Sequence, residues 1–338
     1  MHIEEHVALA PYTSFGIGGP ARYFICAKTP EELAEALSFA RSAHTAVLIL
    51  GGGSNMLVDD RGFDGVVIQL AISGVTYDIA GAHTEVVVGA GESWDGFVSE
   101  MVDKELWGVE NLSGIPGTVG GAVVGNIGAY GQVQSQTLQW VEVYDRHTGE
   151  IGRMSASRCA FGYRESLFKQ QEDRYVVLHA AYQLSHTAQP DTTYADLQKH
   201  FADKSTPSIS SIREAVLSIR KEKFPNVLKE GSAGSFFKNP IVTTQEAALL
   251  HKTYPDMPQF TMPETNGVKI PLGWLIDHVL HLKGFAVGNA RLFEKQALVI
   301  AAKPGCTAHE VRALAEVVRE KIFDVCGITI EHEVKIIS

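Results

Sequence analysis

The sequence predicts an α+β protein with mixed sheets, built from more than one folding unit. Three observations support this class. Strand-like and helix-like segments follow one another without the regular alternation that a parallel α/β sheet requires. The length of 338 residues corresponds to roughly two to three domains of ordinary size. The pattern also changes at the polar stretch 185–191, where we place a boundary.

The first half of the chain combines short apolar strands with two helices. Thr29, Pro30 and Glu32 form a capping pattern, which predicts that a helix begins there. A second helix is expected over 94–106, because its apolar residues recur at helical spacing. Strands are predicted over 22–27, 47–50, 66–70, 85–88, 140–144, 150–154 and 174–184.

Helices are more frequent in the second half. Capping patterns at Thr243 and Thr307 predict helices that end near Tyr254 and Cys326. A glycine at 327 fits the left-handed position that often follows a helix. Further helices are predicted over 209–224 and 270–282, and strands over 297–302 and 328–337.

Composition excludes several classes of function. Lys and Arg number 29 and Asp and Glu 39, and the net charge of −10 argues against nonspecific binding to nucleic acid or an anionic membrane. No apolar run approaches the ~18 residues of a membrane span, and the first residues lack signal-peptide features. The 4 cysteines show no metal or disulfide spacing. We expect a cytoplasmic protein without metal, nucleic-acid partner or membrane insertion.

Glycines gather in two segments. Residues 51–53 follow the strand 47–50, and seven more glycines lie between positions 114 and 131. Neither segment matches a Rossmann fingerprint or a P-loop. Such segments can bring main-chain N–H groups against phosphate oxygens. From the residues alone, a buried loop that packs two sheets explains the second segment equally well.

An ordered set of motifs links the chain to a known family. The motifs are TSFG at 13–16, LGGGSN at 50–55, GIPGTVGG at 114–121, NIGAYG at 126–131, FGYRES at 161–166, AGSFFKNP at 233–240 and EHEV at 331–334. With them the chain resembles the UDP-N-acetylenolpyruvoylglucosamine reductase family, which takes part in peptidoglycan precursor synthesis. The resemblance implies an FAD-binding fold of the vanillyl-alcohol-oxidase type in two lobes, followed by a C-terminal α+β substrate domain.

The resemblance also implies domain bounds and cofactors. The lobes are expected at 1–70 and 71–205 and the substrate domain at 206–327, with the strand 328–338 returning to the first lobe. FAD is expected to bind noncovalently and NADPH to donate hydride, and the absence of Cys and His from both glycine segments agrees with noncovalent flavin. The expected FAD-binding residues are Gly51, Gly52, Gly53, Ser54, Asn55, Ile115, Pro116, Gly117, Thr118, Gly120, Gly121, Asn126, Gly128 and Ala129.

The implied reaction reduces UDP-N-acetylglucosamine enolpyruvate to UDP-N-acetylmuramate. Hydride addition leaves negative charge beside the substrate carboxylate, so the site needs a cation and a proton donor. The resemblance assigns the proton to Ser235, the carboxylate to Arg164 and support of the forming enol to Glu333, which is expected to abut Arg164. The residues alone also fit a turn serine, a surface pair of Arg164 with Glu165, and a solvated face shared by Glu331 and Glu333.

Other residues are expected to bind the substrate diphosphate and sugar. Tyr194 lies in TYADL at 193–197, which looks like the loop that closes over the ligand in one subtype of the family. Lys223 would add charge, although a solvated basic helix end is an alternative. His281 and His332 are interpreted as structural. The expected substrate-binding residues are Tyr163, Tyr194, Lys223, Asn239 and Gln296.

Two rival functions remain at this point. One is another noncovalent FAD oxidoreductase of the same fold with a different acceptor. The other is a nucleotide-sugar-binding protein without redox chemistry, which would not need Ser235 or Glu333. Bound flavin distinguishes the second from the first. For the favoured function, the partners are the UDP-sugar substrate and NADPH, and the chain is expected to be a monomer.

Overall fold

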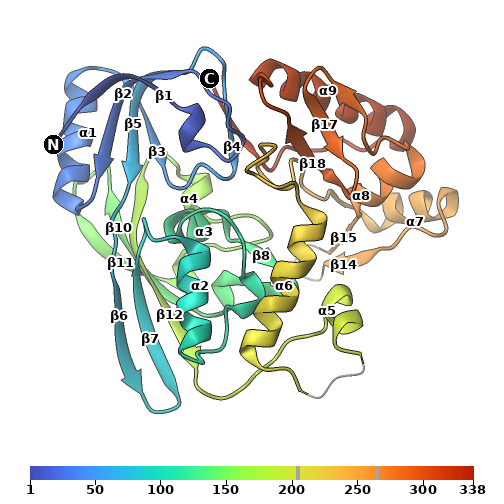
Figure 1. Ribbon diagram of the computed structural model, residues 1–338, viewed down its shortest axis with the longest axis horizontal. Coiled ribbons are helices and arrows are strands. Elements are labelled where there is room, and N and C mark those ends of the chain that lie inside the picture. The colour runs from blue at the N-terminus through green and yellow to red at the C-terminus, as the bar shows by residue number, and fades with distance from the viewer. Residues whose placement is uncertain (203–205, 263–265) are drawn as a thin grey trace. The chain divides into compact units, whose positions relative to one another are not determined.

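The computed structural model describes residues 1–202, 206–262 and 266–338, and its mixture of helices and sheets confirms the α+β class. The chain folds into two compact units, each assembled from several stretches of sequence (Figure 1). Unit 1 comprises Met1–Val7, Ala21–Gly53 and Phe63–Arg220, and unit 2 comprises Ala8–Pro20, Ser54–Gly62 and Lys221–Ser338. The three-domain bounds expected from the sequence stay a prediction.

The first sheet of unit 1 has four strands. In spatial order they are β1 (Glu4–Ala8), β2 (Pro20–Ala27), β5 (Phe63–Leu70) and β3 (Ala46–Leu50). Strands β2 and β3 both run parallel to β5, which lies between them. Helix α1 (Pro30–Ser42) connects β2 to β3, and Thr29 accepts a hydrogen bond from the N–H of Glu32, so the predicted cap is confirmed.

The second sheet of unit 1 is antiparallel. In spatial order its strands are β11 (Ile151–Ser155), β10 (Leu138–Asp145), β12 (Tyr175–Ser185), β7 (His83–Gly89) and β6 (Val75–Ala80), which confirms the predicted hairpin of β10 and β11. Helix α3 (Val119–Gly125) packs on β12 and β7, and helix α2 (Trp94–Asp103) packs beside α3 (Figure 1). Val86 and Val88 are buried in the core, so Val87 between them faces the opposite side of the sheet.

Short elements complete unit 1. They include η2 (Glu110–Leu112), β8 (Gly128–Ala129), β9 (Gln132–Val133), η3 (Gln134–Gln136), η4 (Ala156–Arg158), α4 (Leu167–Gln170) and α5 (Ala195–His200). Helix α6 (Ile209–Lys223) confirms the helix predicted over 209–224. Its residues Ile212 and Val216 are fully buried in the core of unit 1.

The described residues of unit 2 form three small sheets and a core of their own. The sheets consist of β16 (Ala286–Val287), β17 (Ala290–Phe293) and β18 (Gln296–Ala302); of β13 (Ile241–Val242), β15 (Gly267–Lys269) and β14 (Phe260–Met262); and of β4 (Met56–Val58) with β19 (Lys335–Ile337). The 3-10 turn η1 (Ala10–Tyr12) also belongs here. Helices α7 (Thr244–Thr253) and α9 (Ala308–Cys326) begin with capping boxes at Thr243 and Thr307, as predicted.

Two elements of unit 2 differ from the prediction. The expected α-helix over 270–282 is a short α8 (Leu272–Trp274) that widens into the π-helical η5 (Leu275–Val279), where the N–H of Leu280 bonds the carbonyl five residues back. The expected strand 328–337 is regular only at β19. Before β19 the chain bonds the segment around Phe236 instead, and that segment is too irregular to continue the strand.

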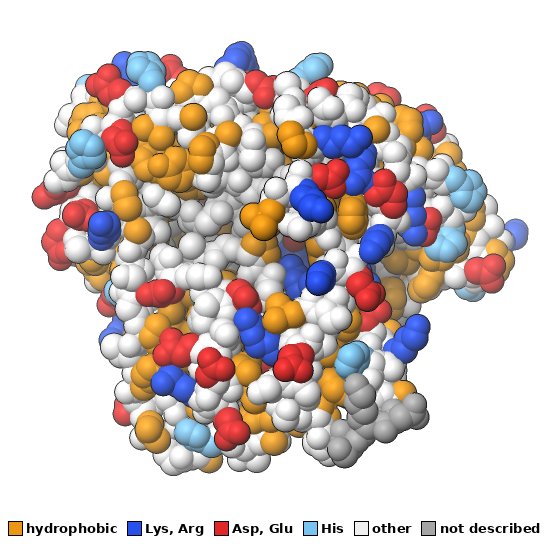
Figure 2. Space-filling view, in the orientation of Figure 1, with side chains coloured by type: hydrophobic (Ala, Val, Ile, Leu, Met, Phe, Trp, Pro, Cys, Tyr) orange, Lys and Arg blue, Asp and Glu red, His pale blue; other side chains and the backbone are white. Residues whose placement is uncertain are grey.

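The surface of the molecule carries charges of both signs. Figure 2 shows acidic and basic side chains interspersed with apolar ones over the visible face. Separate clusters of buried apolar side chains form the cores of unit 1 and unit 2. Within the described ranges, no helix combines the length and the apolar character needed to cross a membrane.

Candidate functional site

The two glycine segments lie against each other in unit 1. A methyl group added at Gly51 would lie 2.7 Å from Oγ1 of Thr118, and one added at Gly52 would lie 2.7 Å from Cα of Gly117. Side chains at these positions would therefore separate the loop after β3 from the loop before α3. The sequence predicted both loops, and the tertiary structure brings them together.

Main-chain donors in this region differ in their availability. The N–H of Gly120 donates to the carbonyl of Ala90 at 2.8 Å, and the N–H of Gly121 donates to Oγ1 of Thr118 at 3.4 Å. In the described part of the chain, no hydrogen bond uses the N–H groups of residues 51–53. The loop after β3 therefore offers donors to a ligand, whereas Gly120 serves close packing.

Arg164 lies in a tight turn that is held by the glycine-rich segment. Gly162 and Glu165 exchange main-chain hydrogen bonds, and Arg164 between them has a φ of 57°, an uncommon value for a residue with a side chain. Nη2 of Arg164 donates to the carbonyl of Gly128 at 2.7 Å, and Nδ2 of Asn126 donates to the carbonyl of Gly162 at 2.8 Å. The expected clamp is thus fixed to the expected cofactor segment.

Two neighbours extend this turn. The Arg164 guanidinium lies 5.7 Å from the ring centroid of Tyr163, within range of a cation–π contact. Oγ of Ser166, which is fully buried, donates to the carbonyl of Val124 at 2.7 Å. The motif FGYRES therefore packs on helix α3 through its serine and presents its tyrosine and arginine together.

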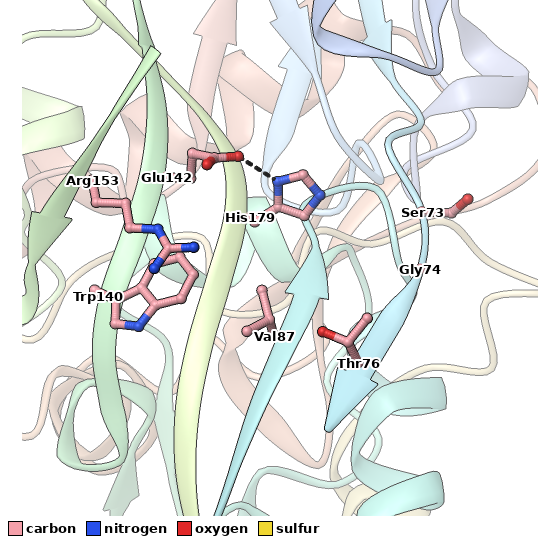
Figure 3. A pocket seen from close by; sticks show the side chains of 8 residues that line it. All are labelled: Ser73, Gly74, Thr76, Val87, Trp140, Glu142, Arg153 and His179. Atoms are coloured by element: carbon pink, nitrogen blue, oxygen red, sulfur yellow. Dashed lines mark hydrogen bonds and ion pairs between the residues drawn. The ribbon is translucent and has the colours of Figure 1, made fainter. Parts of the chain in front are cut away.

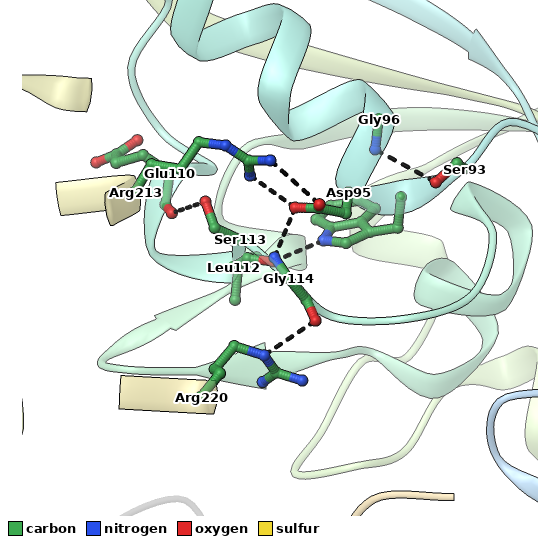
Figure 4. Close-up of polar contacts among 10 residues, drawn as sticks. Ser93, Asp95, Gly96, Glu110, Leu112, Ser113, Gly114, Arg213 and Arg220 are labelled. Atoms are coloured by element: carbon green, nitrogen blue, oxygen red, sulfur yellow. Dashed lines mark hydrogen bonds and ion pairs between the residues drawn. The ribbon is translucent and has the colours of Figure 1, made fainter. Parts of the chain in front are cut away.

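The start of the glycine-rich segment is held by three charged residues (Figure 4). Oδ1 of Asp95 accepts the N–H of Gly114 at 2.6 Å and also Nη1 of Arg213 at 2.6 Å. Nε of Arg220 donates to the carbonyl of Gly114 at 2.9 Å. Burial alone would raise the pKa of Asp95, but the hydrogen bonds from Arg213 and Gly114 hold it below its ordinary value.

Tyr194 lies next to this network. Its ring meets the ring of Tyr130 edge-on, with centroids 5.3 Å apart, and Tyr194 is 42% exposed. Tyr130 is buried, which raises its pKa to about 12, and its hydroxyl accepts a hydrogen bond from Arg220. The exposed ring of Tyr194 therefore packs against the ring of Tyr130, which is buried and uncharged.

In unit 2, the main chain brings Ser235 close to Glu333. Gly234 has a φ of 75°, so the chain turns sharply just before Ser235. The N–H of Phe236 donates to the carbonyl of Leu298 in β18 at 2.7 Å, and the carbonyl of Phe236 accepts the N–H of Glu333 at 2.8 Å. Two motifs that lie far apart in the sequence thus pair directly.

Asn55 joins this pair. Its Nδ2 donates to the carbonyl of Glu333 at 3.2 Å, and its carbonyl accepts the N–H of Lys335 at 3.1 Å. Glu333 is half-buried, whereas Glu331 is exposed and pairs with Nζ of Lys238 at 3.4 Å. The two glutamates, equivalent by strand alternation, therefore differ in environment.

The remaining expected residues lie at the ends of elements. Oδ1 of Asn239 accepts the N–H of Leu272 at 3.0 Å, at the start of α8. Gln296 is the first residue of β18, and Lys223 is the last residue of α6. Both are partly buried. Their expected contacts with substrate stay a prediction.

Some residues that hold the site were not identified from the sequence. Asp95 and Asn111 anchor motif residues through hydrogen bonds, although neither belongs to a motif that we recognised. The available signal for Asn111 is that it stands, together with Glu110, in the otherwise apolar stretch 106–112, where burial requires hydrogen-bond partners. The signal for Asp95 is only its place in the first turn of a helix.

A cavity of about 270 Å³ lies elsewhere, on the outer face of the five-stranded sheet (Figure 3). Nδ1 of His179 lies 2.9 Å from Oε2 of Glu142, and the Arg153 guanidinium stacks 4.0 Å from the ring centroid of Trp140. None of the motif residues lines it. In the described ranges, no cluster of three or more His, Cys, Asp or Glu side chains could hold a metal ion.

Comparisons with known proteins give matches over nearly the whole chain. A family model described as FAD binding domain matches residues 21–155, and one described as UDP-N-acetylenolpyruvoylglucosamine reductase, C-terminal domain, matches residues 226–337. The UDP-N-acetylenolpyruvoylglucosamine reductases of Ralstonia nicotianae and Pseudomonas aeruginosa are 40% and 36% identical, each over 98% of both chains. A crystal structure of UDP-N-acetylenolpyruvylglucosamine reductase from Thermus caldophilus covers 100% of both chains at 29% identity, with a TM-score of 0.71.

Proposed function

The chain belongs to the UDP-N-acetylenolpyruvoylglucosamine reductase family, and from that premise we propose which of its residues carry the reaction. The protein is an FAD-dependent oxidoreductase that uses NADPH to reduce the enolpyruvyl UDP-sugar in peptidoglycan precursor synthesis. The product is UDP-N-acetylmuramate. The roles of the individual residues are our proposal.

The glycine segments of unit 1 fit the pyrophosphate of FAD. The close contact of Gly52 with Gly117 leaves room for main chain only, and residues 51–53 have N–H groups that no hydrogen bond uses in the described ranges. Both features suit an anion held by main-chain donors. When bound, FAD supplies the hydride relay from NADPH to the enol ether. Neither segment contains a Cys or His that could form a covalent link.

Ser235 donates the proton that completes the reduction. The proposed role of Ser235 is supported by the hydrogen bond from the N–H of Glu333 to the carbonyl of Phe236. The proposed residue roles rest mainly on this observation. The bond fixes the turn at Gly234 and places both motifs in one local structure. A hydroxyl is a weak acid, but a carbanion beside a carboxylate is a strong base, so a positioned hydroxyl suffices.

Arg164 binds the substrate carboxylate. A guanidinium keeps its charge at any working pH and can donate two parallel hydrogen bonds to a carboxylate. The turn at residues 162–165 and the bond to Gly128 hold it in place before substrate arrives. Glu333 supports the forming enol, and its contact with Arg164 stays a prediction.

Five further residues are proposed to bind the substrate diphosphate and sugar. Tyr194 covers the diphosphate, supported by its exposure and by the ring of Tyr130 beneath it. Lys223 adds positive charge. A chain with a net charge of −10 needs such local cations in order to bind an anionic ligand. Tyr163, Asn239 and Gln296 add hydrogen bonds.

We place the protein in the cytoplasm as a monomer that needs neither nucleic acid nor membrane. Its four cysteines are free, as expected in a reducing compartment. The substrates NADPH and UDP-sugar are small anions, which suit a local basic site in an acidic protein. Size-exclusion chromatography with light scattering measures the assembly state, and a dimer at micromolar concentration would contradict this part.

An anaerobic experiment in two steps tests the function. NADPH should bleach the flavin, and the enolpyruvyl UDP-sugar added afterwards should restore its colour with formation of UDP-N-acetylmuramate. Bleaching without reoxidation by this substrate would favour the rival oxidoreductase with another acceptor. A colourless protein that takes up no flavin would favour the rival binding protein.

A further inference from the structure

Asn111 is a buried amide that joins two segments of the candidate site. It lies in η2 and is fully buried. Its Nδ2 donates to the carbonyl of Tyr130 at 2.8 Å and to the carbonyl of Asp191 at 2.8 Å. Because both partners are acceptors, the orientation of the amide is fixed. Its main-chain N–H donates to Oε1 of Gln132 at 3.1 Å, so η2 is held as well.

The second of these segments leads to Tyr194. Oδ1 of Asp191 accepts hydrogen bonds from the N–H of Thr193 at 2.9 Å and from the Oγ1 hydroxyl of Thr193 at 2.6 Å. These two bonds order the chain just before Tyr194. A methyl group added at Gly131 would lie 3.0 Å from Oδ2 of Asp191, so glycine permits the close approach. The loop therefore meets the glycine-rich segment at one well-defined place.

The first segment carries the support for Tyr194. Tyr130 has a φ of 49° and its ring lies under the ring of Tyr194. Holding the main chain of Tyr130 and the main chain of Asp191 with one amide fixes the distance between the two tyrosines. Oδ1 of Asn111 has no hydrogen-bond partner among the described residues, so the amide acts through its two donors while its buried acceptor is unused.

We infer that Asn111 is a positioning residue, which holds the loop that bears Tyr194 in the geometry that receives the UDP-sugar diphosphate. This inference rests on the proposed role of Tyr194. It predicts that Asn111 acts on substrate binding and not on the reduction of flavin, because the hydrogen bonds of Asn111 go to Gln132, Tyr130 and Asp191 and not to the loop at 51–53 or the turn at Arg164.

The test is Asn111→Asp, which keeps the shape and replaces the two donors by an acceptor. We expect KM for the enolpyruvyl UDP-sugar to rise about tenfold, as for the loss of two ordinary hydrogen bonds. The rate of flavin reduction by NADPH and the FAD content should stay within about twofold. Gln139→Glu is the matched control, because the same amide-to-acid change at an exposed position should leave KM unchanged.

Tyr194→Ala separates this inference from the function on which it rests. If Tyr194→Ala leaves KM unchanged, the role of Tyr194 is wrong. If it raises KM while Asn111→Asp does not, only the inference about Asn111 is wrong. In the double variant the two effects should be non-additive. Equal losses of flavin content and of both half-reactions in Asn111→Asp would mean a merely structural role and would overturn the inference.

A second variant covers the case that Asn111→Asp does not fold. Asp191→Ala removes the bonds to Thr193 at a partly exposed position and leaves the buried amide intact. We expect a smaller rise of KM in the same direction, with flavin reduction unchanged. An unchanged KM in Asp191→Ala would overturn the inference.

Discussion

At the scale of single residues, Ser235 illustrates how little a side chain reveals without its surroundings. Nothing in the residues beside Ser235 distinguishes its hydroxyl from that of other serines, and serines near glycine most often shape turns. What distinguishes it is the fixed main chain on both sides, through Gly234 and through the bonds of Phe236. The neighbouring Ser232 shapes the turn, because its Oγ accepts a hydrogen bond from the N–H of Gly234 at 3.2 Å.

Ser235→Ala should leave the reduction of flavin by NADPH intact and slow reoxidation by the enolpyruvyl UDP-sugar. The slowing should reach about two to four orders of magnitude, the usual contribution of a positioned proton donor. Stopped-flow absorbance of the flavin measures both steps. Ser232→Ala is the comparison: it loosens the turn at Gly234 but keeps the Ser235 hydroxyl, so it should lower the melting temperature and slow reoxidation far less than Ser235→Ala does. Equal losses in both steps for Ser235→Ala would argue that Ser235 is structural.

His332 offers a prediction about pH. Burial among the rings of Phe236 and Phe237 lowers the pKa of His332, and the nearby Arg319 lowers it further. Its Nε2 has no hydrogen-bond partner in the described part of the chain. Folding therefore disfavours protonation of His332, whereas the same histidine in the unfolded chain binds a proton near pH 6.5. Stability should consequently fall as the pH drops below that value.

His332→Leu should make the fall in melting temperature between pH 7 and pH 5 shallower. The contribution of one such histidine to the free energy of unfolding is at most about 1.4 kcal/mol per pH unit. Calorimetry at several pH values measures it. His147→Leu, at an exposed position in the β10–β11 turn, should reproduce the profile of the unchanged protein. An identical slope in His332→Leu would contradict the assignment.

At the scale of elements, the close contact between the two glycine loops has a direct consequence. A methyl group at Gly52 would meet the main chain of Gly117, which cannot move aside as a flexible side chain could. Because Gly52 does not have a positive φ, an alanine there is strained by this contact alone. The loop after β3 and its N–H donors would shift together.

Gly52→Ala should therefore weaken FAD binding by roughly tenfold or more, which corresponds to losing one good hydrogen bond to phosphate. Titration of the apoprotein with FAD, followed by flavin fluorescence, measures the affinity. Gly152→Ala in β11 is the matched control, since a methyl group there meets open space. Unchanged FAD affinity in Gly52→Ala would show that this contact does not shape the cofactor site.

At the scale of the whole molecule, unit 2 depends on stretches from the first part of the chain. Strand β19 pairs in parallel with β4, and Oδ1 of Asp60 accepts the N–H of Ala308 at the start of α9 at 2.8 Å. The ring of Phe15 packs on the ring of Phe236 in the core of unit 2. A cut at the end of α6 would remove all three contributions.

The isolated fragment 221–338 should therefore not fold cooperatively, although it includes the whole match to the C-terminal family model. Leaving β19 without a partner and removing part of the core lowers the stability of the fragment, and the stability of a folded domain is marginal to begin with. Dispersion in the amide region of its NMR spectrum, compared with that of the full chain, measures this. A dispersed spectrum and a sharp thermal transition would contradict the prediction.

The sequence by itself determined most of the local structure, and its motifs indicated the family and the reaction through their resemblance. Capping patterns at Thr29, Thr243 and Thr307 predicted the starts of three helices, because caps depend on residues within one turn. The α+β class, the family and FAD were also confirmed. The residue roles stay predictions.

Only the tertiary structure decided which distant segments of the chain contact each other. It brought Gly52 to Gly117 and Phe236 to Glu333, and it ended the predicted strand 328–337 early. It also placed Asn111 between Tyr130 and Asp191, which no motif indicated. Such contacts join segments far apart in the chain, and their partners are chosen by the packing of whole cores. Local propensity cannot specify them, because a buried amide or strand finds its partner only after those cores have formed.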